Sequence, residues 1–213
     1  LAYRSFDSDL ALAIARTEGR SQIVQTRFGR MEYAVAGAGA PVLMIHGTGG
    51  GFDQGLDFTM PIATQWQIIA PSRFGYLRSE VPPDPSSENQ ADAFVDLLDH
   101  LGIARAGLIG GSAGALSALQ FAIRHPDRLS ALIALVPASY APGRPPVRPP
   151  NRFAQAIIDY ALKSDAVFWA GTKLAETRMI GALLATDSEV FNHAGADEQA
   201  RARAILRNIL PIS

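Results

Sequence analysis

One serine in this chain has glycine neighbours at a spacing suited to nucleophilic chemistry. Gly110, Ser112 and Gly114 form a Gly-x-Ser-x-Gly motif between an apolar run and a helix-like stretch. A serine on a sharp strand-to-helix turn exposes its hydroxyl, and side chains at the flanking positions would collide with the adjacent strand or helix. The motif alone has little specificity, but the strand before it and the helix after it are the context it requires. We therefore predict that Ser112 is a nucleophile.

A second glycine-rich stretch has the composition of a site for a negatively charged oxygen. Residues 46–51 read His-Gly-Thr-Gly-Gly-Gly and follow directly on the apolar run 42–45. Backbone N–H groups in such a loop can hold an anion. A phosphate-binding loop would need Gly-Lys-Ser/Thr or a helix-opening GxGxxG, and neither spacing occurs here. An oxyanion hole is therefore favoured over a bare turn, with the backbone N–H groups of Thr48 and Ala113 as donors.

Composition excludes several other functions. The 213 residues carry a net charge of −1, which gives no sign of binding to nucleic acid or to an anionic membrane surface. The lack of cysteine excludes disulfides, thiolate metal sites and a cysteine nucleophile, and neither a metal nor an organic cofactor is expected. No apolar run reaches transmembrane length. A cytoplasmic location is the default expectation, and the start at Leu1 without methionine leaves a membrane anchor upstream as the alternative.

The elements that must position these residues alternate between strand and helix patterns. Apolar runs typical of buried strands occupy residues 42–45, 66–70, 106–109 and 129–136. Helices are predicted at 5–17, 113–124 and 87–101, the last with Ser87 as its cap and Gln90 completing a capping box. A hairpin over 22–36 turns at Gly29 and Arg30. This order of elements implies right-handed crossovers and a mostly parallel sheet in an α/β fold.

The pattern changes beyond residue 137. Six prolines between 137 and 150 predict a stiff linker, and helices are expected at about 151–163, 173–184 and 197–210. We therefore expect two domains, a core over 1–138 and a helical cap over 139–213. The alternative is a small helical subdomain that buries its own core, which would use most of the same aromatic side chains.

These motifs together resemble those of the α/β-hydrolase superfamily. The resemblance rests on residues 42–47, 73–76, 110–114 and 125–128, in the family's order, and covers about 22–138. It implies an α/β-hydrolase sheet with an inserted helical cap, Ser112 as nucleophile, and Thr48 and Ala113 as oxyanion donors. The residues then expected to contact a small-molecule, ester-like substrate are Gly47, Gly49, Phe168 and Trp169. Ser72 departs from the family, which often has an acidic residue before the arginine.

The other two members of a catalytic triad are not found in this chain. The family's acid and histidine follow the nucleophile on later loops, but the cap takes up most of the 101 residues after Ser112. His46 belongs to the oxyanion turn, His100 and His125 lie at helix ends, and His193 lies in the cap. We expect a C-terminal part outside this chain, roughly 70–90 residues by analogy with capped members, to supply the acid, the histidine and the closing strands. The alternative to a continuous chain is that this part is a separate polypeptide after a nick beyond Ser213. Without it, the sheet would end in an unpaired apolar edge.

The expected function is hydrolysis of a carboxylic ester or of a related acyl or carbon–carbon bond. Ser112 would attack, the oxyanion would rest on two backbone N–H groups, and a histidine would carry the proton. The same fold and nucleophile can also host a lyase or a perhydrolase. A catalytically inactive hydrolase-like domain that binds a ligand or partner is the alternative from another class. An acid and a histidine within hydrogen-bond reach of Ser112 would distinguish enzyme from binding domain.

Overall fold

The chain forms two compact units. The computed structural model describes residues 2–139, 160, 163–184 and 186–212. One unit, the sheet unit, is Thr17–Pro145, and the other, the helical unit, combines Leu1–Arg16 with Pro146–Ser213. The N-terminal helix therefore groups with the C-terminal helices, whereas the sequence placed residues 1–16 with the sheet. The proposed linker and the helix predicted at 151–163 lie mostly outside the described residues.

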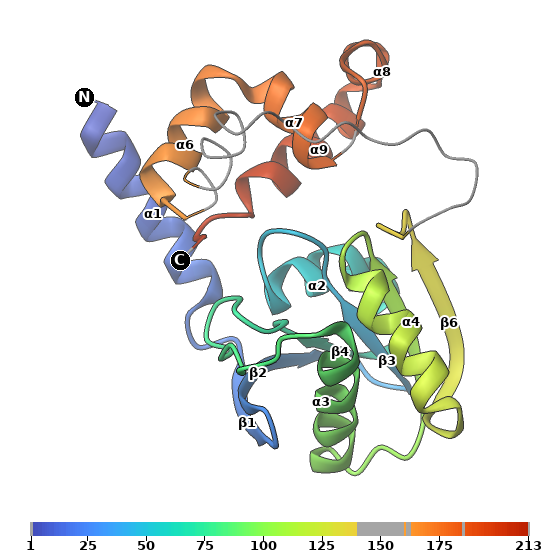
Figure 1. Ribbon diagram of the computed structural model, residues 1–213. Coiled ribbons are helices and arrows are strands. Elements are labelled where there is room, and N and C mark those ends of the chain that lie inside the picture. Colours follow the sequence, from blue (N-terminus) through green and yellow to red (C-terminus); the bar gives the residue numbers. More distant parts are fainter. Residues whose placement is uncertain (1, 140–159, 161–162, 185, 213) are drawn as a thin grey trace. The chain divides into compact units, whose positions relative to one another are not determined.

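A mostly parallel sheet of six strands organises the described part of the sheet unit. Its strands are β1 (Gln22–Thr26), β2 (Gly29–Ala36), β3 (Ala40–Ile45), β4 (Trp66–Pro71), β5 (Ala106–Gly111) and β6 (Leu129–Leu135). They lie in the order β1-β2-β4-β3-β5-β6, and β4, β3, β5 and β6 are parallel (Figure 1). The sequence predicted each parallel strand at its observed place to within two residues.

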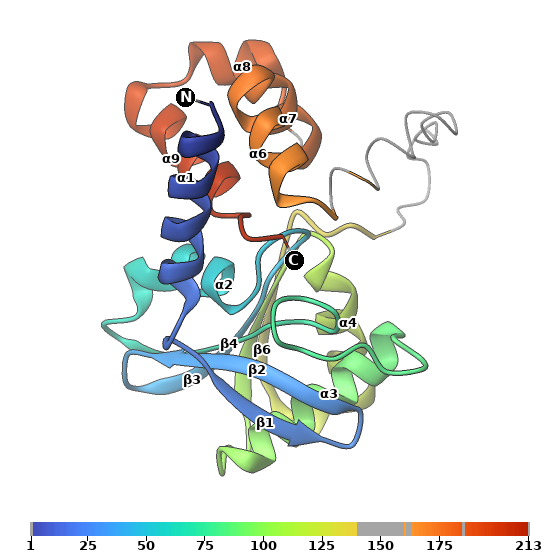
Figure 2. The same ribbon diagram turned by 90° about the vertical axis from the view of Figure 1, so that its left-hand side faces the viewer.

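The β1–β2 hairpin forms the antiparallel edge of this sheet, as Figure 2 shows. Its turn lies at Arg27 and Phe28, two residues earlier than predicted. The reason is the side chain of Thr26, whose hydroxyl donates to the Gly29 carbonyl at 2.8 Å and accepts the Phe28 N–H at 3.1 Å. Gly29 and Arg30, predicted as the turn, therefore begin β2.

Helices cover both faces of the sheet. Leu43 and Ile45 of β3 belong to the core shared with α3 (Ser87–His100) and α4 (Gly114–Arg124), which lie on one face (Figure 1). Val42 and Met44 belong to the core on the other face, with Phe52 and Leu56 of α2 (Phe52–Thr59). Successive residues of a strand point to opposite faces, so β3 is buried on both sides, as predicted.

Two short elements of the sheet unit have weak local signals. The sequence did not predict α2, because it follows three glycines, has no side-chain cap and contains Gly55. Close packing against the sheet stabilises α2 despite these weak local signals. A Cβ on Gly55 would lie only 3.0 Å from the Ala70 Cβ, so the helix approaches β4 closely at this point. Single 3-10 turns, η1 (Met60–Ile62) and η2 (Pro126–Arg128), complete this unit.

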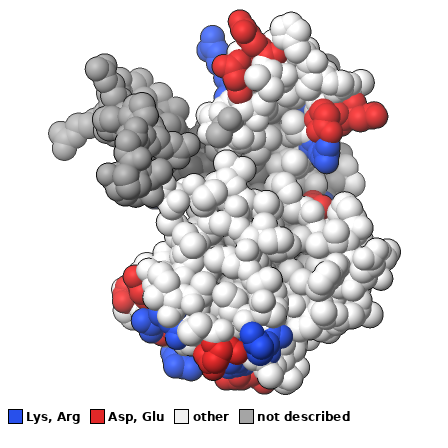
Figure 3. Space-filling view, turned by 90° about the vertical axis from the view of Figure 1, so that its right-hand side faces the viewer, with Lys and Arg blue, Asp and Glu red and all other residues white. Residues whose placement is uncertain are grey.

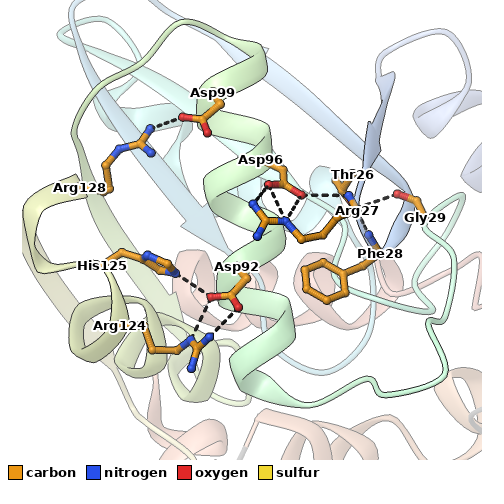
Figure 4. A network of polar contacts seen from close by, with 10 residues as sticks. All are labelled: Thr26, Arg27, Phe28, Gly29, Asp92, Asp96, Asp99, Arg124, His125 and Arg128. Atoms are coloured by element: carbon orange, nitrogen blue, oxygen red, sulfur yellow. Dashed lines mark hydrogen bonds and ion pairs between the residues drawn. The ribbon is translucent and has the colours of Figure 1, made fainter.

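A row of aspartates ties α3 to its neighbours. Asp92 pairs with Arg124 and His125 at the end of α4, Asp96 pairs with Arg27 of the hairpin turn, and Asp99 pairs with Arg128 (Figure 4). The three acids recur every three or four residues, so they lie on one side of the helix. The cap of α3 is Ser86, which accepts the Asn89 N–H at 3.3 Å, one residue before the predicted Ser87.

The sequence predicted strand β6 as buried, which is wrong, and also predicted that the sheet would end in an unpaired apolar edge, which β6 forms in the structure. It pairs only with β5 among the described residues and forms the edge of the sheet. Ile133, Leu135 and Val136 expose 51%, 44% and 81% of their surface. On the face of the sheet unit in Figure 3, charged side chains gather at one end and leave the rest of the face with few. The apolar sequence of β6 is therefore that of an interior strand, although its surroundings here are those of an edge.

The helical unit has its own core. The helices among its described residues are α1 (Ala2–Thr17), α6 (Asp165–Leu174), α7 (Glu176–Leu184), α8 (Ser188–His193) and α9 (Ala196–Arg207). The side chains of Phe168, Ile180, Phe191 and Leu206 are buried together with Ala13 of α1. The helix predicted at 173–184 corresponds to α7, but it begins at Glu176, because residues 173 and 174 belong to α6 and Ala175 separates the two helices. No helix in the described ranges is long and apolar enough to cross a membrane.

Candidate active site

Ser112 occupies a strained turn at the carboxyl end of β5. Its φ angle is +46°, in the left-handed region that side-chain-bearing residues rarely adopt. The backbone is held there from two sides: the Ser112 N–H donates to the Leu135 carbonyl at 2.9 Å, and its own carbonyl accepts from the N–H groups of Ala115 and Ala138, each at 3.1 Å. The residue is exposed. The geometry is therefore that of a serine presented to solvent on a strand-to-helix bend.

The two flanking glycines are needed for steric reasons. A Cβ on Gly114 would lie 2.3 Å from the carbonyl oxygen of His46, and one on Gly110 would lie 2.7 Å from the Cβ of Ala118. Both distances are far below normal contact. The structure thus explains the motif as predicted: position 110 must let α4 approach β5, and position 114 must let α4 approach the end of β3.

The glycine-rich loop after β3 lies beside the serine. A Cβ on Gly47 would be 3.2 Å from the Ser112 Cβ, so any larger residue at 47 would crowd the hydroxyl. Gly49 lies in the same loop with a φ of +82°, while Thr48 is exposed. Within the described part of the chain, neither the Thr48 N–H nor the Ala113 N–H donates to a protein acceptor. Both predicted oxyanion donors are therefore available to a ligand.

His46 is fully buried and holds this loop in place. Its Nε2 accepts the Arg73 N–H at 2.9 Å, so Nδ1 carries the proton and donates to the Gly47 carbonyl at 2.9 Å. Burial, together with the nearby charge of Arg73, lowers the pKa of His46 to about 3. With both ring nitrogens engaged, His46 cannot act as the general base for Ser112.

Two residues that sequence reasoning did not assign to the site also contact the loop. The Gln54 side chain, on α2, accepts the Gly47 N–H at 3.0 Å. The Arg73 guanidinium donates to the Gly47 carbonyl at 2.8 Å and to the Tyr76 hydroxyl at 3.2 Å. In the sequence, Arg73 is only one residue of the motif 73–76, and Gln54 lies on a helix that was not predicted. Neither residue could therefore be assigned to the site from the sequence.

A buried acid stands near the position where the resemblance led us to expect one. Ser72 replaces the family's acidic residue, and its hydroxyl donates to Glu32 of β2 at 3.0 Å. Glu32 also accepts from Arg78 at 2.7 Å and from Ser21 at 2.6 Å. The carboxylate therefore comes from a different strand, and it anchors the loop after β4.

No base for Ser112 is found among the described residues. None of their hydrogen bonds involves the Ser112 hydroxyl. His125 is bound to Asp92 at 2.7 Å and ends the 11-residue helix α4, which places it about 16 Å along that helix from the serine turn. His100 is exposed at the end of α3, and the His193 ring bonds to the Glu189 carbonyl in the helical unit.

The aromatic residues predicted to contact substrate lie in the helical unit. Phe168 is only 1% exposed, so it is an interior side chain of that unit and has no free surface to offer a substrate. Trp169 is half-buried, donates its indole N–H to Asp9 at 2.8 Å and packs edge-on against Phe6. These contacts agree with the alternative that the helical block buries its own core. In the residues that the structure describes, no cluster of three or more acidic or histidine side chains could hold a metal ion.

Comparison with known sequences and structures identifies the family. The sequence model described as "alpha/beta hydrolase fold" matches residues 40–198, about three quarters of the chain. The chain belongs to the alpha/beta hydrolase family. Among solved structures, the alpha/beta hydrolase fold protein from Nakamurella multipartita is similar over 90% of this chain and 67% of its own, with a TM-score of 0.67 and 24% identity. A likeness at that identity supports the fold alone.

Curated relatives of this alpha/beta hydrolase are hydrolases as well. An uncharacterized hydrolase of Bacillus subtilis (strain 168) is 38% identical over 104 residues, 49% of this chain and 37% of the relative. The 2-hydroxymuconate semialdehyde hydrolase of Pseudomonas sp. (strain CF600) is 39% identical over 107 residues, 47% of this chain and 37% of the relative. The matches thus span little more than a third of the length of these relatives.

Proposed function

We propose that this protein is a serine hydrolase that acts on a carboxylic ester or a related acyl bond. The observation that carries the proposal is Ser112, exposed on a turn with φ of +46° between β5 and α4. Ser112 attacks the carbonyl carbon, and the resulting oxyanion is stabilised by the N–H groups of Thr48 and Ala113. Gly47 and Gly49 keep the loop small enough for a substrate to approach the serine.

The general base and its acid, in this proposal, come from a segment outside these 213 residues. Three observations support this. No histidine contacts the Ser112 hydroxyl among the described residues, the curated relatives extend well beyond the matched region, and β6 exposes apolar side chains at the sheet edge. A further parallel strand on β6 would cover those side chains and place a following loop at the same sheet end as Ser112.

The substrate class is narrowed only by the chemistry of the serine. Esters and acyl compounds fit an attacking hydroxyl with an oxyanion hole, and the Pseudomonas relative is named for hydrolysis of 2-hydroxymuconate semialdehyde. A panel of p-nitrophenyl esters of increasing chain length, with 2-hydroxymuconate semialdehyde added, would separate ester hydrolysis from cleavage of that semialdehyde.

Labelling with a fluorophosphonate probe tests the proposal. We expect the complete protein to be labelled, and Ser112→Ala to lose both labelling and ester hydrolysis. A matched control is Ser117→Ala, since Ser117 is a buried serine on α4. If the wild-type protein is folded but not labelled, the result favours the alternative, an inactive domain that binds a ligand. The observation that supports this alternative is that the Ser112 hydroxyl has no hydrogen-bond partner among the described residues.

A further inference from the structure

A single carbonyl group, that of Gly47, accepts two hydrogen bonds behind the proposed oxyanion site. The Arg73 guanidinium donates to it at 2.8 Å, and the His46 ring donates at 2.9 Å. This carbonyl belongs to the same peptide unit as the Thr48 N–H, because the peptide bond joins residues 47 and 48. Donors at the carbonyl therefore act directly on the peptide that would bind the oxyanion.

Two physical effects follow from this arrangement. The peptide plane is fixed, because its carbonyl is bound on one side and the preceding Gly47 N–H is bound by Gln54 at 3.0 Å. The peptide is also polarised, because a cation at the carbonyl withdraws electron density and makes the N–H at the other end a stronger donor. A donor that is fixed and polarised before the reaction needs no rearrangement when charge develops.

The half-buried guanidinium of Arg73 has no carboxylate partner among the described residues. Among the ion pairs of the described residues none includes Arg73, and its Nε is buried without a hydrogen-bond acceptor. Two buried acids lie near this loop, and neither forms an ion pair with Arg73: Glu32 is bound to Ser72 and Arg78, and Asp53 accepts the Gly51 N–H at 2.8 Å. Burial lowers the pKa of Arg73, while the Tyr76 ring lies 4.8 Å from the guanidinium carbon. A half-buried cation that lacks a counter-ion is costly to keep, unless negative charge appears near it during function.

We infer that Arg73 is a positioning residue that fixes and polarises the Gly47–Thr48 peptide, so that the Thr48 N–H stabilises an oxyanion bound at Ser112. The inference rests on the proposed function of that site and assigns the arginine an electrostatic role beyond holding its own loop. Arg73 acts through the peptide and does not touch the substrate.

Kinetics with p-nitrophenyl acetate on the complete protein test the role in turnover. We expect Arg73→Gln to lower kcat by about ten- to a hundredfold with KM changed by less than about twofold, since an oxyanion contact strengthens in the transition state. Arg73→Lys, which restores the charge without the planar fork, should recover part of kcat. The matched control is Arg78→Gln, which removes the Glu32 pair from the same loop but leaves the Gly47 carbonyl untouched.

A spectroscopic readout keeps the test independent of turnover. In amide NMR spectra, the Thr48 proton should move upfield in Arg73→Gln and less so in Arg73→Lys, while Arg78→Gln leaves it in place. If kcat of Arg73→Gln stays within about twofold of wild type, or if Arg78→Gln lowers kcat equally, the inference is overturned. A wild-type protein without hydrolysis or labelling would defeat the proposed function, and the Thr48 shift would still decide whether Arg73 polarises this peptide.

Discussion

The buried imidazole of His46 makes the sheet unit sensitive to mild acid. In the folded protein, burial lowers the pKa of His46 to about 3, whereas an unfolded chain has a histidine pKa of about 6.5. At pH values between about 3 and 6.5, His46 is protonated in the unfolded chain but neutral in the folded protein. The contribution of His46 is therefore complete above pH 6.5, and the free energy of unfolding falls as the pH is lowered through this window.

The size of the effect follows from the two pKa values. From pH 7 to pH 5, the titration of His46 lowers the free energy of unfolding by about 2 kcal/mol. This value depends little on the folded-state pKa as long as that pKa stays below about 4. Two substitutions keep one hydrogen bond each. His46→Asn keeps a donor near the Gly47 carbonyl, and His46→Gln keeps an acceptor near the Arg73 N–H.

Urea unfolding at pH 7 and pH 5 measures this difference. In a Trp169→Phe background, Trp66 of β4 is the remaining tryptophan and its fluorescence reports on the sheet unit. We expect both His46 variants to be less stable than the parent at pH 7 but to lose about 2 kcal/mol less on going to pH 5. His100→Gln, at an exposed position, should behave like the parent. Equal losses in the parent and in His46→Asn would refute the assignment of this pH dependence to burial of His46.

Three further predictions concern the turn at Ser112 and the helix α4 that follows it. Ser112→Gly should be more stable than Ser112→Ala by about 1 kcal/mol in urea unfolding, because glycine adopts a φ of +46° without strain; equal stabilities would argue against strain at this turn. Gly114→Ala should lower the free energy of unfolding by at least about 3 kcal/mol, since the new Cβ would lie 2.3 Å from a carbonyl oxygen. Gly102→Ala is the control: a Cβ there meets open space but the φ is +68°, so it should lower the free energy of unfolding by only about 1 kcal/mol. The hydrogen bond from Arg124 lowers the pKa of Asp92, so Asp92→Asn should be less stable than wild type at pH 7, with a gap that narrows as the pH falls below about 4; a constant gap would contradict the ion pair.

Local chemistry was enough to locate the turn that carries Ser112. Glycine at 110 and 114, an apolar run before Ser112 and a proline after the helix are local features, and each has a steric meaning that the structure reproduces. The same holds for the parallel strands, because an apolar run such as that of β3 is stable only when both of its faces are covered.

Short elements depended on contacts between distant residues. Helix α2 has weak helix propensity, and it forms because Phe52 and Leu56 pack on the sheet. The capping residue of α3 and the turn after β1 differ from the prediction by one and two residues for a local reason, since a side-chain hydrogen bond between residues three positions apart decides each. Such choices differ by about 1 kcal/mol, too little for a sequence pattern to resolve.

By itself, the sequence determined the family, the fold class and the strand-to-helix turn that carries Ser112, because these follow from steric rules that act over a few residues. Only the tertiary structure decided what surrounds that serine. It brought the side chains of Arg73, Gln54 and His46 to the backbone of one residue, Gly47, and it placed the Glu32 carboxylate of another strand against Ser72. Those outcomes depend on which distant groups share a buried space, and spacing along the chain carries no record of that.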